Sequence, residues 1–207
     1  MGMLPTRLFG AAMALLAACL LAAAPAARAG ETFKKPEFTI TLPDGWVEMS
    51  KTELAQFNAN VRKHPAGKKA AQFRYGFHPG VSGNPGRYPY IVARVTAGGR
   101  IAEDALRKLQ TVDLNQALEK EKHKLPAFIS KAMLGRPLYE PALHTIWVTA
   151  QMNVRDGGQV EGLTAIIATK TGFVQVSAWA TQDSFASYFP VFHKVMASVV
   201  LPRRLRY

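Results

Sequence analysis

Apolar and polar residues alternate in several short runs of this 207-residue chain, the pattern of half-buried β-strands. Near the start, the alternating residues of 37–42 are followed by Pro43-Asp44-Gly45, which suits a tight turn, and Trp46 resumes the apolar pattern. Residues 37–49 are therefore expected to form a β-hairpin. Two further strands are predicted at residues 70–77 and 90–97, joined by a loop at residues 78–89 that is rich in proline and glycine.

The strongest strand patterns occur between residues 146 and 180. Apolar residues alternate from Ile146 to Val154, and two further strands are predicted at 160–169 and 173–180, after turns at Asp156-Gly157-Gly158 and Thr171-Gly172. Connections this short require antiparallel pairing. Residues 163–168 are apolar at nearly every position, which predicts cover on both faces of the sheet. Residues 128–140 show only a short strand around 132–134.

Helical signals separate these strands. Ser50 and Glu53 have capping-box spacing and open a helix expected to reach about residue 61. Residues 101–125 show helical spacing, with Asp113 placed to begin a second segment. A final stripe of Phe185, Phe189, Phe192 and Met196 predicts a closing helix that Pro190 kinks or restarts. The fold class is thus α+β, a mainly antiparallel sheet flanked by helices on both faces (an α/β/α sandwich).

The first 29 residues have the three parts of a secretory signal peptide. Arg7 precedes an apolar run from Leu8 to Ala24, and Ala27-Arg28-Ala29 supplies small residues before a cleavage point at Gly30. Residues 30–207 then form a single globular domain that is exported, in a periplasmic location. Two other interpretations stay open: lipidation at Cys19, which follows Leu16-Ala17-Ala18, and an uncleaved anchor, since the run is long enough to span a bilayer.

Charge and cysteine content narrow the function classes. Without Arg7 and Arg28, the remaining chain carries 24 basic and 14 acidic side chains, a formal charge of +10. A field of this sign favours anionic partners, such as an acidic protein, a membrane or a cell-wall polymer, and export makes nucleic acid an unexpected partner. Cys19 is the only cysteine of the chain, so the domain itself has no thiol nucleophile, thiolate metal ligand or disulfide.

The basic residues and three tyrosines give the candidate binding sites. An anion-binding role is predicted for two basic clusters: Arg62, Lys63, Lys68 and Lys69, and, near the end of the chain, Arg203, Arg204 and Arg206. Three aromatic residues near the 78–89 loop could line a ligand pocket: Tyr75, Tyr88 and Tyr90.

Patterns for enzymatic chemistry are missing from the sequence. The five histidines lack metal-ligand spacing, and Gly80-Val81-Ser82-Gly83-Asn84 lacks the last glycine and the strand-to-helix setting of a nucleophile elbow. We therefore assign no catalytic, cofactor-binding or metal-binding residues. An exported hydrolase or cell-wall-active enzyme, with a site near residues 78–90 that includes His78 and Ser82, is the alternative function.

Two short stretches resemble the PsbP-like group of extrinsic photosystem subunits and exported bacterial relatives such as DcrB. They are Phe38-Thr39-Ile40-Thr41-Leu42-Pro43-Asp44-Gly45-Trp46, and the set Phe185, Phe189, Pro190, Phe192 and Ser198. The resemblance implies an α/β/α sandwich and a non-catalytic, accessory or binding role, and it transfers no site residues. The expected function is an exported accessory or binding protein that docks on an anionic partner or membrane surface.

Overall fold

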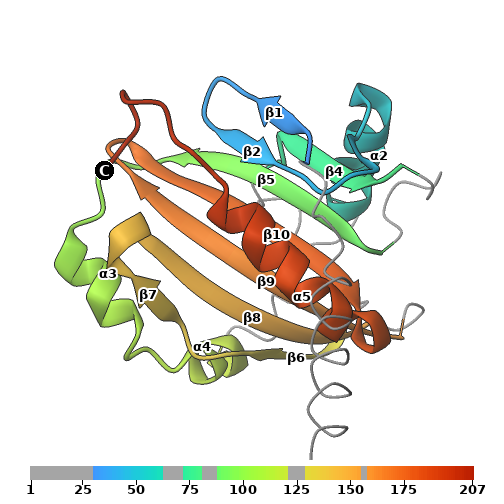
Figure 1. The fold of residues 1–207 in the computed structure, drawn as a ribbon. Coiled ribbons are helices and arrows are strands. Elements are labelled where there is room, and N and C mark those ends of the chain that lie inside the picture. Colours follow the sequence, from blue (N-terminus) through green and yellow to red (C-terminus); the bar gives the residue numbers. More distant parts are fainter. Residues whose placement is uncertain (1–29, 63–71, 81–87, 121–128, 155–157) are drawn as a thin grey trace, which may run out of the picture.

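The computed structural model describes residues 30–62, 72–80, 88–120, 129–154 and 158–207, so the predicted signal peptide lies outside the described residues. Within these ranges, eight strands form one antiparallel sheet in the order β3-β4-β5-β10-β9-β8-β6, with β7 also paired to β8 (Figure 1). The strands are β3 (Trp46–Glu48), β4 (Tyr75–Pro79), β5 (Tyr90–Ala97), β6 (Ile129–Leu134), β7 (Leu138–Glu140), β8 (Thr145–Val154), β9 (Gly158–Thr169) and β10 (Gly172–Thr181).

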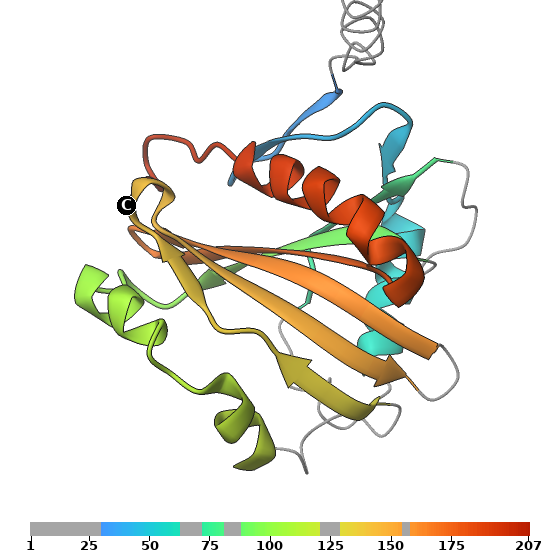
Figure 2. The ribbon, with the colours of Figure 1, turned by 60° about the horizontal axis from the view of Figure 1, so that its bottom comes forward.

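Helices lie on both faces of this sheet, which confirms the predicted fold class. Figure 2 shows α5 (Gln182–Ala197) on one side and α2 (Lys51–Arg62), α3 (Glu103–Leu109) and α4 (Leu114–Lys120) on the other. We call these sides the α5 face and the α3 face. Among the described residues, no helix has the length and apolar composition needed to cross a membrane.

The predicted hairpin of residues 37–49 is wrong. Strand β2 (Thr39–Thr41) pairs with β1 (Thr32–Lys34) in a separate two-stranded sheet, whereas β3 pairs with β4 in the main sheet. The turn at residues 43–45 therefore carries the chain from one sheet to the other. Packing accounts for this course, because it buries Trp46 edge-on against Phe192 of α5, with ring centres 6.4 Å apart.

The predicted meander of β8, β9 and β10 is confirmed. In β9, Ala165 pairs with Val176 of β10 and lies in the core under α5, while the next residue, Ile166, points to the α3 face. Cover on both faces explains why residues 163–168 of β9 are apolar at nearly every position.

The helix starts agree with the sequence signals. The Ser50 amide donates to the Glu53 carboxylate at 2.7 Å, the Glu53 amide donates to Ser50 Oγ at 3.2 Å, and Asp113 accepts two amide hydrogen bonds at the start of α4. Helix α5 continues through Pro190 as one helix, so it does not restart there. Pro190 is exposed, and so is Ala186, whose carbonyl loses its donor and can bond to water.

The segment with the unclear pattern contains two strands. Strands β6 and β7 pair one after the other with the same edge of β8, and a register shift interrupts β6 between Ile129 and Lys131. A short 3₁₀ helix, η3 (Pro141–Leu143), then leads into β8. The register shift breaks the regular alternation of residues between the two faces of the sheet. The pattern of apolar and polar residues therefore did not reveal the strands at this edge.

Candidate anion-binding surface

The C-terminal segment joins distant basic residues at one end of the sheet. The amide of Lys170, in the β9–β10 turn, donates to the Leu205 carbonyl at 3.1 Å, and Thr169 forms a bridge with Arg206. The end of β5 reaches the same turn, since the Gly98 amide donates to one of its carbonyls. Five exposed basic residues lie here, and we call them the basic end: Arg100, Lys170, Arg203, Arg204 and Arg206.

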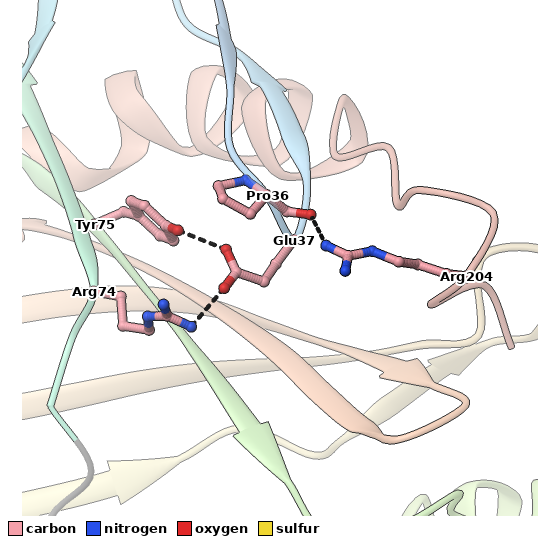
Figure 3. Close-up of polar contacts among 5 residues, drawn as sticks. All are labelled: Pro36, Glu37, Arg74, Tyr75 and Arg204. Atoms are coloured by element: carbon pink, nitrogen blue, oxygen red, sulfur yellow. Dashed lines mark hydrogen bonds and ion pairs between the residues drawn. The ribbon is translucent and has the colours of Figure 1, made fainter.

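Contacts with neutral groups hold three of these side chains. The Arg204 guanidinium donates to the Pro36 carbonyl beside the β1–β2 turn at 2.7 Å (Figure 3), and Arg206 Nε donates to a backbone carbonyl of the C-terminal segment at 3.0 Å. The Arg100 guanidinium lies over the Tyr207 ring, 4.3 Å from its centre. These contacts position the cations without cancelling their charge.

The basic end has no acidic counterpart within the described part of the chain, where none of its side chains lies within 4.0 Å of a carboxylate. Arg74 shows the contrast, because its guanidinium is paired with Glu37 (Figure 3). The other oxygen of that carboxylate accepts the Tyr75 hydroxyl at 2.5 Å. Glu37 thus compensates Arg74 and leaves the basic end as a surface of uncompensated positive charge.

The structure describes one of the two predicted basic clusters. Arg203, Arg204 and Arg206 belong to the basic end, to which the fold adds Arg100 and Lys170. Arg62 is the last residue of α2, and Lys63, Lys68 and Lys69 lie outside the described residues. Sequence reasoning missed Arg100 and Lys170 because the only local signal of each is a basic residue within two positions of a turn glycine.

The three predicted pocket tyrosines do not share one site. Tyr75 lies on the α5 face, where its ring meets Phe38 edge-on and its hydroxyl is bound to Glu37. Burial raises the pKa of Tyr75 to about 12, and the hydrogen bond and charge of Glu37 add to the rise. Tyr90 lies on the α3 face, stacked on Tyr88 with ring centres 5.3 Å apart, and burial also raises the pKa of both phenols.

His78 lies in β4 and is buried, which corrects its predicted loop position. Its Nε2 is 3.8 Å from the Glu53 carboxylate of α2, and Nδ1 is 2.8 Å from the Pro79 carbonyl oxygen. Hydrogen bonds from Ser50 are the main cause that lowers the pKa of Glu53, and His78 contributes less. This pair connects α2 to β4, while Ser82 lies outside the described residues.

Metal-ligating side chains do not cluster in the part of the chain that the structure describes. There, no group of three or more histidine, cysteine, aspartate or glutamate residues could hold an ion.

No protein-family model matches the sequence, and no curated protein matches it. Several solved structures are similar, including the following three. Cyanobacterial PsbP from Synechocystis has a TM-score of 0.49 at 10% identity, over 87% of this chain and 96% of its own. LpqN of Mycobacterium tuberculosis, involved in cell envelope biogenesis, has a TM-score of 0.45 at 15% identity, over 83% and 90%. The Saccharomyces cerevisiae Ran-binding protein Mog1p has a TM-score of 0.42 at 7% identity, over 83% and 95%.

The PsbP structure belongs to the group that the sequence resemblance names.

Proposed function

We propose that this chain is an exported, non-enzymatic binding protein that docks on an anionic partner through the basic end. The observation that carries the proposal is the convergence of five exposed cations from three separate segments, with no carboxylate within ion-pair distance among the described residues. Export is inferred from the signal-peptide pattern of residues 1–29.

The strength of such docking follows from simple electrostatics. A basic side chain near an anionic membrane contributes about 1 kcal/mol, and this attraction decays over about 8 Å at physiological ionic strength. Five neighbouring cations are sufficient for reversible binding that added salt weakens. No proton transfer or nucleophile is involved.

Lys170 and Arg203 are the residues to change first. Their side chains are exposed and make no contact that the fold needs, whereas Arg204 and Arg206 hold backbone carbonyls. We expect Lys170→Gln with Arg203→Gln to weaken binding of the exported protein to phosphatidylglycerol vesicles about 30-fold at low salt, because two contributions of about 1 kcal/mol are lost. Vesicle co-sedimentation over a salt series measures this.

A matched control variant tests whether the loss of affinity is specific to the basic end or follows from the lower net charge of the protein. Lys51→Gln with Lys131→Gln removes the same charge from exposed positions on α2 and β6, and should change the affinity by less than about threefold. Equal losses in both variants, or no loss in either, would contradict docking through the basic end.

A further inference from the structure

Exposed apolar side chains gather along one side of α5. Eight large hydrophobic residues of the described chain are exposed, and four of these line two neighbouring cavities. Leu138 and Phe189, 61% and 38% exposed, line the larger cavity. Leu143 and Val200, 42% and 53% exposed, line the smaller. Such a concentration is uncommon on a surface that only meets water.

The larger cavity, of about 870 Å³, lies between α5 and the β7–β8 edge. Its lining is mainly apolar, and Trp147 contributes a rigid surface. The Trp147 indole N–H donates to the Glu140 carboxylate at 2.8 Å, and the His193 ring stacks on the indole with centres 4.8 Å apart. Both contacts hold the indole in place, and a volume of this size suits a small apolar ligand.

The smaller cavity, of about 370 Å³, continues along the same side of α5 toward the C-terminal segment. Helix η3 contributes to both, with Pro141 in the larger and Leu143 in the smaller. Phe189, His193 and Ala197 are four residues apart on α5 and so lie on one stripe of the helix. The two cavities share no lining residue but lie one after the other along α5, and together we call them the apolar path.

The apolar path ends at positive charge. Arg206 of the basic end lines the smaller cavity. Between Phe189 and Ala197 the helix rises about 12 Å, comparable with one acyl chain, which spans half of a hydrocarbon core about 30 Å thick. A lipid supplies an anionic headgroup and an extended apolar chain in one molecule, whereas a wall polysaccharide has no such chain and would leave this path empty.

We infer that the two cavities bind the acyl chain of an anionic lipid whose headgroup lies on the basic end. This inference rests on the proposed function and names its anionic partner as a membrane lipid. The cations draw the protein to the bilayer surface, and the path along α5 accepts one chain from it. No covalent step occurs.

The test uses exposed positions, where substitution leaves the core intact. We expect Leu138→Gln with Phe189→Gln to weaken binding to phosphatidylglycerol vesicles about tenfold, because two apolar contacts with the chain are lost, and to leave binding to soluble polyglutamate unchanged. The matched control is Val47→Gln with Met133→Gln, which changes two exposed apolar residues, 40% and 47% exposed, outside both cavities. It should bind both probes like the parent.

A second measurement reports directly on contact between the protein and the acyl chain of the lipid. Phosphatidylglycerol with brominated acyl chains should quench the fluorescence of Trp147, taken as the difference from the same protein with Trp147→Phe because the chain has three tryptophans. The quenching should be weaker in Leu138→Gln with Phe189→Gln at an equal bound fraction. Unchanged vesicle affinity and quenching in that variant, together with loss in Lys170→Gln with Arg203→Gln, would overturn the lipid inference and leave the proposed function standing. If the charge variant also binds like the parent, the proposed function fails. A dimer that dissociates in Leu138→Gln with Phe189→Gln would overturn the inference in favour of a second copy.

Discussion

Helix α5 covers its face of the sheet with one continuous core, whereas the α3 face is covered in separate patches. Nineteen buried residues, contributed mainly by β2–β5, β8–β10 and α5, belong to the core of the α5 face. The cluster under α3 contains four buried residues, Leu106, Tyr139, Ile146 and Ala168. Helix α2 forms another patch, where the Phe57 ring meets Tyr90 edge-on.

A polar row crosses the α3 face. Arg94 Nε donates to the Gln175 side-chain oxygen at 2.9 Å, Gln175 donates to Ser177 Oγ at 3.0 Å, and that hydroxyl lies 2.9 Å from the Thr164 hydroxyl. The residues that flank Gln175 and Ser177 on β10, Val174 and Val176 among them, belong to the α5 core. Strand β10 thus has an apolar side and a polar side. We expect the α5 face to determine the global free energy of unfolding, and the α3 face to unfold locally.

The largest decrease in the free energy of unfolding is expected when Phe192 is removed from the α5 core. This ring is fully buried and contacts Trp46 and Tyr188. Phe192→Ala should lower the free energy of unfolding by about 3–5 kcal/mol, since the cavity lies where β3, α5 and the central strands meet. Urea unfolding followed by circular dichroism measures it. Phe189→Ala, one turn earlier on the exposed side, should cost less than about 1 kcal/mol; similar losses would contradict a continuous core.

A smaller effect is expected under α3. Leu106 is fully buried, but its cluster has four members and its helix has seven residues. Leu106→Ala should cost about 2 kcal/mol, the low end for leucine. In this variant, backbone amide hydrogen exchange should become faster in α3 than in the parent, while β9 changes less. The reason is that a cluster of this size can open without unfolding of the whole domain. Leu109→Ala, which is exposed, is the matched control. Equal acceleration in both elements would show that the two faces unfold together.

Local signals predicted the parts of the fold that depend on near neighbours. The alternation from Ile146 onward is that of β8 against β9, and the Ser50–Glu53 pair forms the capping box that its spacing predicts. Cover on both faces of β9 was also predictable, because it requires only that residues 163–168 be apolar.

The remaining features depend on contacts between distant segments. Lys170 and Arg206 come together only because the C-terminal segment returns to the end of β9. Tyr75 is separated from Tyr90 because the register of β4 and β5 places them on opposite faces. The apolar path along α5 includes Leu138, which lies in the segment without a clear pattern. Neither spacing nor composition contains this information.

The smallest expected change in stability occurs at alkaline pH. It concerns Tyr75 on the α5 face and can be distinguished from the titration of Tyr90 on the α3 face. Burial is the main cause that raises the pKa of both phenols. For Tyr75, the hydrogen bond and the charge of Glu37 (Figure 3) add to the rise, which takes its pKa from 10 to about 12. Between pH 10 and about 12 the unfolded chain releases the Tyr75 proton while the folded chain keeps it. Stability is therefore complete below pH 10 and falls as pH rises through this range.

Glu37→Gln removes a charge from the α5 face and leaves Tyr90 untouched. The pKa of Tyr75 should fall toward 10, so its phenolate forms at lower pH and stability declines less between pH 10 and 12 than in the parent. Phenolate absorbance of each protein, minus that of the same protein with Tyr75→Phe, isolates this one group, and urea midpoints over the same pH series give the stability. An unchanged Tyr75 titration in Glu37→Gln would mean that burial alone sets its pKa. The α5 face would then differ from the α3 face in its packing and not in its charge.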